Sequence, residues 1–220
     1  MTTPDPGSGP IRVLLVDDHP VVRDGYRHVL ENAPDIRVAG EAPDGETACR
    51  LYREILPDVV ILDLSMPGID GLETLRRLKA LDSAVRVLVF TMHDSETMIV
   101  RTLKAGAIGY LTKGSGMAQM VDAVRAVAQW KPHIDSAHVT DVVRNMLAGT
   151  SREPLEALSA REFELFNRFA EGQSVAAIAA ALHISPRTVG VHHANIMKKL
   201  GLQNTAQLVR LAIRCNLIPP

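Results

Sequence analysis

Five polar residues stand where apolar runs of the sequence end. Asp17 and Asp18 follow the run IRVLLV, Asp63 closes DVVILD, Thr91 follows VRVLVF, and Lys113 comes shortly after AIGYL. A single aspartate at such a place is usually a turn or cap residue, but caps do not explain the whole set. Three carboxylates that converge without a cation repel one another, whereas Mg²⁺ is a hard ion that takes oxygen ligands and keeps several waters. The set therefore predicts a magnesium site.

The runs that precede these residues read as the strands of a parallel sheet. Their starts are 22 to 27 residues apart, and each run is followed by a stretch with helical spacing of apolar residues, which leaves room for one crossover helix. This alternation predicts a doubly wound α/β domain whose ligands bind at the carboxyl ends of the strands. The expected strands cover 11–16, 36–42, 58–63, 85–90 and 107–111.

After Trp130 the strand signal stops and helical signals follow. We expect the α/β domain over 11–130, a linker over 131–154 with a helix near 136–147, and an all-α domain over 155–220. Within residues 155–220, helix-capping residues and glycines that end helices divide the sequence into four predicted helices. These helices are expected over 159–171, 174–182 and 186–200, with the fourth after Asn204.

Composition excludes several classes of protein. The chain is 46% hydrophobic and 22% charged, which is typical of globular proteins. The longest apolar run, residues 175–182, is far shorter than the ~20 residues that cross a bilayer, and the first ten residues do not resemble a secretory signal. The only cysteines, Cys49 and Cys215, provide neither a disulfide framework nor a zinc site. We expect a cytoplasmic protein with no membrane partner.

Residues 11–130 resemble the receiver domain of two-component response regulators. The resemblance is carried by LLVDDHP, ILDLSMPGIDG, VFTMHD and GYLTKG, in that order. It implies a five-stranded sheet in the order 2-1-3-4-5 and a phosphoryl group accepted by Asp63 from a sensor histidine kinase. It also implies that Asp18, Asp63 and the backbone carbonyl of Ser65 bind Mg²⁺, with Asp17 acting through water.

The residue types suit this chemistry. Asp63 would be the nucleophile that forms an acyl phosphate, while Mg²⁺ and Lys113 neutralise the phosphoryl oxygens. Thr91 could donate a hydrogen bond once a phosphoryl group is present, and the resemblance pairs it with Tyr110 as a switch, although Tyr110 could equally be a core aromatic residue. Gly114 stands where many receivers have proline, a departure that concerns only the local backbone.

No catalytic residue is expected, and the chain is not predicted to be an enzyme. At most, the acyl phosphate would hydrolyse slowly in place. A phosphatase or phosphotransferase with an aspartate nucleophile is the competing hypothesis. Against it, the segment Asp63-Leu64-Ser65 lacks the second carboxylate that such enzymes use as acid and base, and no substrate-covering segment is visible.

Residues 158–216 resemble the LuxR-type helix-turn-helix domain through LSAREFEL, FAEGQS, IAAALHIS and RTVGVHHANIMKKLGL. The resemblance implies that helix 186–200 lies in the major groove of double-stranded DNA and that the helix after Asn204 is a dimer contact. A mild excess of positive charge agrees: residues 155–220 hold 7 Lys/Arg and 4 Asp/Glu, against 14 and 18 in residues 1–130. The expected DNA-contacting residues are Arg187, Val191, His193, Lys198 and Lys199.

This domain departs from the family pattern at three places. Val175-Ala176-Ala177 replaces a polar Asn-Lys-Glu, Gly190 stands where lysine is common, and Thr205 replaces a basic residue. Either Val191 packs against thymine methyl groups with His193 or Arg187 as polar partner, or DNA affinity is low.

The leading hypothesis is a response regulator in which phosphorylation of Asp63 controls sequence-specific DNA binding and transcription. It would form a homodimer when phosphorylated, with RNA polymerase as a further candidate partner. The alternative is a protein-interaction module whose helix-turn-helix has weak or lost DNA binding.

Overall fold

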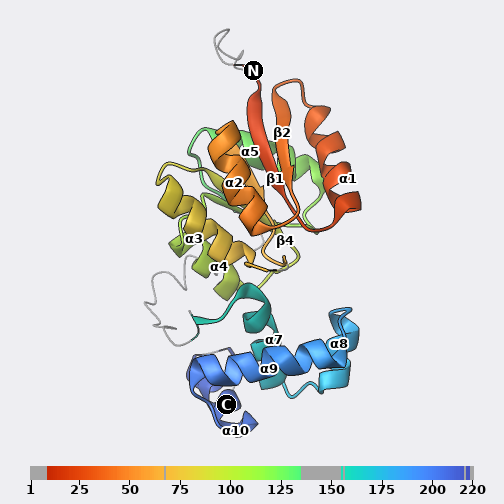
Figure 1. The fold of residues 1–220 in the computed structure, drawn as a ribbon, viewed down its shortest axis with the longest axis vertical. Helices are drawn as coiled ribbons and strands as arrows, with labels where there is room; N and C mark the ends of the chain where they lie inside the picture. Colours follow the sequence, from red (N-terminus) through yellow and green to blue (C-terminus); the bar gives the residue numbers. More distant parts are fainter. Residues whose placement is uncertain (1–8, 67, 135–154, 156, 216, 219–220) are drawn as a thin grey trace. The chain divides into compact units, whose positions relative to one another are not determined.

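A computed structural model of the chain describes residues 9–66, 68–134, 155, 157–215 and 217–218. The chain divides into two compact units, Met1–Asn145 and Met146–Pro220, which are described separately (Figure 1). The helix expected near 136–147 lies outside the described residues.

The N-terminal unit is built on a parallel sheet. Its order is β2-β1-β3-β4-β5-β6, which confirms the predicted order 2-1-3-4-5 and adds one strand at the edge. The strands are β1 (Ile11–Val16), β2 (Ile36–Ala42), β3 (Val59–Leu62), β4 (Val87–Thr91), β5 (Gly109–Thr112) and β6 (His133–Ile134).

The added strand β6 was missed by sequence analysis. It pairs in parallel with β5, in the register Gly109↔His133 and Tyr110↔Ile134. Two residues that follow Lys131-Pro132 carry no periodicity, so hydrophobic pattern alone offers no signal for such a strand.

Five helices cover the two faces of the sheet (Figure 1). They are α1 (Pro20–Glu31), α2 (Gly45–Ile55), α3 (Gly71–Leu81), α4 (Glu96–Lys104) and α5 (Met117–Ala128). Three of them begin at a side-chain cap, since Asp44, Asp70 and Ser95 each accept a hydrogen bond from a backbone amide of the first turn. Such caps satisfy amides that the helix itself leaves unbonded.

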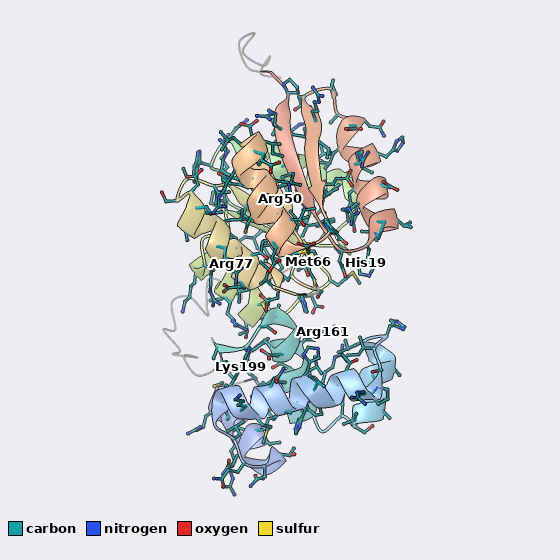
Figure 2. The ribbon with its side chains drawn as sticks, in the orientation of Figure 1. His19, Arg50, Met66, Arg77, Arg161 and Lys199 are labelled. Carbon is teal, nitrogen blue, oxygen red and sulfur yellow. The ribbon has the colours of Figure 1, made fainter. Side chains whose placement is uncertain are left out.

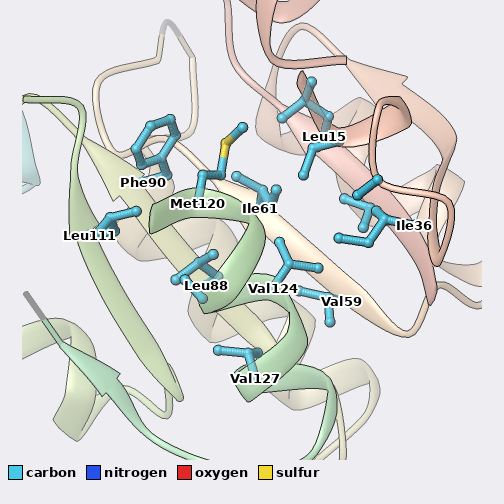
Figure 3. Close-up of a cluster of buried hydrophobic side chains, with 14 residues drawn as sticks. Leu15, Ile36, Val59, Ile61, Leu88, Phe90, Leu111, Met120, Val124 and Val127 are labelled. Carbon is cyan, nitrogen blue, oxygen red and sulfur yellow. The ribbon is translucent and has the colours of Figure 1, made fainter. Parts of the chain in front are cut away.

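The core explains why the central strands are apolar throughout. Every residue of β3 and β4 is buried, because helices cover both faces. On one face, Met120, Val124 and Val127 of α5 pack toward the sheet (Figure 3). Burial of each large apolar side chain stabilises the fold by about 1.5–3 kcal/mol. This packing fixes the carboxyl ends of the strands.

The C-terminal unit contains the four helices expected from the sequence. They are α7 (Ala160–Ala170), α8 (Val175–Ala181), α9 (Pro186–Leu200) and α10 (Thr205–Arg214). Ser159 and Glu162 form the predicted capping box, and Ser185 caps α9 ahead of Pro186. Gly201 ends α9 with a φ of 63°, in the left-handed region that glycine adopts readily. Among the described residues, no helix combines the length and apolarity needed to cross a membrane.

Candidate functional site

The carboxylates predicted from the sequence meet at one end of the sheet. β1 and β3 are parallel neighbours, so Asp17, which follows β1, and Asp63, which follows β3, leave the sheet at the same edge. Both are buried, with 2% and 3% of their surfaces exposed. Asp18 is partly exposed beside them. Figure 2 marks this end of the unit with the labelled side chains His19 and Met66.

Lys113 joins the two buried carboxylates. Its Nζ donates to Asp17 Oδ2 and to Asp63 Oδ2, each at 2.6 Å, and only 9% of its side chain is exposed. Burial lowers the pKa of Lys113, but the charges and hydrogen bonds of Asp63 and Asp17 outweigh this effect and raise the pKa above its ordinary value. The lysine is therefore a firmly protonated cation within the site.

The Asp63 carboxylate is oriented from both sides. Its Oδ1 accepts hydrogen bonds from the backbone amides of Leu64, at 2.6 Å, and Ser65, at 3.2 Å, while Oδ2 is held by Lys113. The segment after Asp63 is also held by α3, because the Gly71 amide at the start of this helix donates to the Leu64 carbonyl at 3.1 Å.

Gly71 allows this contact because it lacks a side chain. A Cβ at this position would lie 2.1 Å from the Asp63 carbonyl oxygen and 2.6 Å from the Leu64 Cα. Both atoms belong to the backbone, so they have no side-chain torsion by which to move away. The residue at 71 therefore controls how closely α3 approaches the segment that carries Asp63.

The donor set fits a hard divalent cation. Asp17, Asp18 and His19 bring ligand atoms within 4.8 Å of one another, and carboxylate oxygens are the ligands that Mg²⁺ prefers. Sequence analysis did not place His19 in the site, yet its Nδ1 lies 2.7 Å from Asp18 Oδ1 and its amide donates to Asp17 Oδ1 at 2.8 Å. The one available signal was its position directly after the aspartate pair.

Thr91, the last residue of β4, and Tyr110, in β5, are fully buried. The Thr91 hydroxyl has no hydrogen-bond partner among the described residues. The Tyr110 hydroxyl donates to the backbone carbonyl of His93 at 2.8 Å, so its ring already points inward. Burial, then the charges of Asp63 and Asp94, raises the pKa of Tyr110 well above its ordinary value. Tyr110 thus acts as a neutral hydrogen-bond donor.

His93 connects the loop after β4 with the loop after β3. Its Nε2 lies 2.8 Å from the Ser65 Oγ, and its carbonyl accepts from Tyr110. Sequence analysis missed this residue, because a histidine two positions after a strand carries no signal without the fold.

Tyr26 was also missed as part of the site. Its ring lies edge-on to Phe90, with centroids 4.9 Å apart, and its centroid is 6.0 Å from the Lys113 Nζ. Its position beside the lysine depends on how α1 packs against the sheet, and the sequence alone does not show this.

In the C-terminal unit, α9 has one buried and one exposed side. Val189 and Ile196 are buried. Arg187, Gly190, Val191, Ala194 and Lys198 are all exposed, and Val191 is 55% exposed although it is apolar. A Cβ at Gly190 would meet nothing within 4 Å. The predicted DNA-facing side of the helix is therefore exposed. It carries a cation near each end, and Gly190 and Ala194 offer no polar side chain between them.

Two of the predicted DNA-contacting residues are engaged within the unit. The His193 ring packs edge-on against Phe169, with centroids 4.6 Å apart. The Lys199 Nζ lies 2.5 Å from Glu162 Oε2, and the same carboxylate oxygen accepts the Ser159 amide at 2.9 Å (Lys199 is labelled in Figure 2). Arg187, Val191, Lys198 and Lys199 are exposed, whereas His193 is partly buried.

Comparison with protein families matches both units. Residues 13–125 match the response regulator receiver domain, and residues 156–212 match the luxR family of bacterial regulatory proteins.

Comparison with individual proteins matches nearly the whole chain. The chain is 37% identical to the response regulator UvrY of Escherichia coli K12 over 210 residues, which is 94% of this chain and 96% of that protein. It resembles the crystal structure of the response regulator ChrA of a heme-sensing two-component system, with 36% identity, a TM-score of 0.52 and coverage of 96% and 100%. It also resembles RcsB of Salmonella enterica serovar Typhimurium bound to the promoter rprA with the phosphomimetic BeF3⁻, with 28% identity, a TM-score of 0.56 and coverage of 92% and 98%.

Proposed function

The chain belongs to the response regulators that join a receiver domain to a luxR-type DNA-binding domain, and from this membership we propose that phosphorylation of Asp63 by a sensor histidine kinase controls its binding to specific DNA sequences. The observation that carries the proposal is the Asp63 carboxylate itself. It is buried at the carboxyl end of β3 and held by Lys113 and by two backbone amides.

The chemistry at Asp63 is a phosphoryl transfer. A carboxylate oxygen attacks the phosphorus, the bond from phosphorus to the donor nitrogen breaks, and an acyl phosphate forms. Asp18, Asp63 and the Ser65 carbonyl would hold Mg²⁺, with Asp17 acting through water, and the bound ion would supply positive charge for the phosphoryl oxygens. Lys113, already against Asp63, supplies the second positive charge.

The switch begins at Thr91. Its buried hydroxyl has no partner among the described residues and can donate to a phosphoryl oxygen on Asp63. Since Tyr110 already points inward, we infer that phosphorylation fixes the inward arrangement that the structure shows. The chain is a phosphoryl-accepting regulator and not an enzyme, and slow hydrolysis of its own acyl phosphate is the one reaction we assign to it.

The C-terminal unit would bind DNA through α9. Arg187 and Lys198, both exposed, would contact phosphates, and Val191 would contact the methyl group of a thymine in the major groove. His193 and Lys199 would contribute from positions partly held by Phe169 and Glu162. We propose a homodimer in the phosphorylated state through α10, with RNA polymerase as a further partner at the promoter.

The competing function is a protein-interaction module. The exposed apolar residue Val191 favours it, because it lies on the side of α9 that would otherwise meet DNA. Selection of bound fragments from a random DNA pool separates the two functions, using the full chain treated with acetyl phosphate and Mg²⁺. Enrichment of one sequence supports DNA binding, whereas no enrichment above the starting pool favours the interaction module.

Val191→Ala is expected to relax the selected sequence at a thymine and to leave the rest of the motif unchanged. A thymine methyl loses its apolar contact, while the phosphate contacts remain. Selection with the variant measures this effect, and Val175→Ala on α8 is the matched control for loss of an exposed valine. If both variants select the wild-type motif, Val191 does not read a base.

Lys199→Ala is expected to lower the stability of the C-terminal unit, whereas Lys198→Ala should weaken DNA binding without lowering stability. Lys199 is paired with the buried Glu162, but it is 42% exposed, so we expect a loss of about 1–2 kcal/mol. Lys198 is an exposed cation of the same helix turn and serves as the control. Urea unfolding and binding of labelled DNA measure the two effects.

The difference in stability between the wild type and Lys199→Ala should depend on pH. Burial raises the pKa of Glu162, but hydrogen bonds from Lys199 and Ser159 outweigh burial, so the pKa in the folded state lies below its ordinary value. The ionised carboxylate therefore stabilises the fold above its unfolded pKa, and this contribution is lost as pH falls through the folded pKa. Wild type and Lys199→Ala should converge in stability in that acidic range. Equal stability of the two proteins at neutral pH would contradict a structural role for the pair.

A further inference from the structure

We propose that β6 transmits the phosphorylation state of Asp63 out of the N-terminal unit, because its pairing with β5 tightens when Asp63 is phosphorylated. The strand lies near the start of the segment predicted as the linker, residues 131–154, so its state would pass into the rest of that linker. The inference rests on the proposed function, since it takes phosphorylation of Asp63 as its starting event.

The pairing of β6 is limited and therefore adjustable. Among the described residues, which end at Ile134 on this side, two residue pairs join β6 to β5, Gly109↔His133 and Tyr110↔Ile134. A hydrogen bond contributes about 1 kcal/mol net to stability, and a strand this short is therefore held only weakly against β5. Edges of this kind open locally at much lower free energy than the core. A small change in β5 is thus enough to shift the population of the docked strand.

The surface of β5 is shaped for close approach at Gly109. A Cβ there would lie 2.8 Å from Leu88 Cδ1, 2.9 Å from Val127 Cγ2 and 3.1 Å from the His133 carbonyl oxygen. The third atom belongs to the β6 backbone. A side chain at 109 would thus contact the sheet, α5 and β6 too closely. The glycine at this position therefore allows β6 to pair with β5 at the observed distance.

A continuous set of contacts leads from the phosphorylation site to this pairing. Thr91 and Thr112 are register partners in β4 and β5, and the Lys113 amide donates to the Thr91 carbonyl at 2.8 Å. Two residues after Thr91, the His93 carbonyl accepts the Tyr110 hydroxyl, and Tyr110 is the residue paired with Ile134.

This set gives the direction of the effect. A phosphoryl oxygen that accepts from the Thr91 hydroxyl adds an anchor at the end of β4, beside the contacts that His93 already makes in the loop that follows. The anchored loop holds the His93 carbonyl in place, which holds Tyr110 and thereby the backbone of β5 against Ile134. Phosphorylation should therefore slow the opening of β6.

The start of the segment before β6 is fixed to the body of the unit. Arg86 Nη1 donates to the Ala128 carbonyl at the end of α5 at 2.9 Å, and the Lys131 amide donates to the Ala126 carbonyl at 2.9 Å. Opening of β6 is thus limited to residues after Lys131. The motion is therefore transmitted along the chain after β6 and not back into α5.

Hydrogen exchange of the backbone amides at 133 and 134 in the full chain tests the proposal. Exchange is resolved by NMR with and without Mg²⁺ and beryllium fluoride, an analogue of the phosphoryl group. We expect the analogue to slow exchange in the wild type at least about fivefold, in keeping with local opening as a separate equilibrium. Tyr110→Phe keeps the ring but lacks the hydroxyl, and it should lose this response.

Two glycine variants provide the matched comparison. Gly109→Ala should give fast exchange at 133 and 134 in both states, because the added Cβ displaces β6. Gly114→Ala should behave as the wild type, since a Cβ at 114 would meet nothing within 4 Å. Equal exchange in the wild type with and without the analogue would overturn the proposal, as would a full response in Tyr110→Phe.

Failure of the underlying function is recognised separately by intact mass after treatment with acetyl phosphate. A wild-type chain that gains no phosphoryl group overturns the proposed function together with this inference. A chain that is labelled on Asp63 but shows unchanged exchange at 133 and 134 overturns the inference alone.

Discussion

Asp63→Asn is expected to abolish phosphorylation of the chain by acetyl phosphate in the presence of Mg²⁺. Asparagine has nearly the same shape, so the amides of Leu64 and Ser65 can still donate to its side-chain oxygen, but the amide lacks the negative charge and the nucleophilic carboxylate oxygen. Intact mass measures the uptake of one phosphoryl group. The same variant should also lose any phosphorylation-dependent change in DNA binding.

An exposed carboxylate provides the control for this substitution. Asp24→Asn on α1 removes one negative charge from the same unit at a side chain that is 76% exposed, and it should be labelled as the wild type is. Full, acid-labile labelling of Asp63→Asn would show that the acceptor is another residue. Loss of labelling in both variants would point to a general effect of charge and would leave Asp63 without a special role.

Gly71→Ala is expected to destabilise the N-terminal unit by about 3 kcal/mol or more, because the added methyl group would overlap the backbone of Asp63 and Leu64. α3 must then move away from the segment that carries the acceptor, so the rate of phosphorylation should fall as well. Urea unfolding and the time course of labelling by acetyl phosphate measure the two effects.

Gly25→Ala is the matched control. Gly25 lies inside α1, and a Cβ at this position would meet nothing within 4 Å. Alanine is favoured over glycine in a helix by about 1 kcal/mol, so this variant should be slightly more stable than the wild type. If Gly71→Ala is as stable as Gly25→Ala, α3 does not need its close approach to the acceptor segment.

The elements were predictable because their signals are local. The apolar runs gave the five main strands, and capping residues such as Ser159 and Ser185 gave the starts of helices in the C-terminal unit. The strands β3, β4 and β5 begin one or two residues later than expected, at Val59, Val87 and Gly109. Boundaries depend on which backbone groups find partners in the sheet, and hydrophobic pattern does not record this.

The site residues that sequence analysis missed depend on contacts across the fold. His93 acts through Ser65 and Tyr110, which lie 28 and 17 residues away, and no short motif contains such a pair. The engagement of Lys199 with Glu162 spans 37 residues and likewise has no local signal. Residue type and position in a motif predicted Asp63 and Lys113, which the fold brings together. Tertiary packing decides which neighbouring side chains are already hydrogen-bonded to other residues.

The position of Lys113 in the chain has a consequence for protein synthesis. The lysine that bonds Asp17 and Asp63 follows them by 96 and 50 residues and comes directly after β5, the last of the five main strands to leave the ribosome. A nascent chain that has folded only as far as β4 holds the aspartates without their cation, and like charges then oppose closure of the site. The hydrogen-bonded arrangement around Asp63 is therefore completed only when the N-terminal unit is nearly finished. A kinase that transfers its phosphoryl group to this site thus also selects for chains whose translation has passed β5.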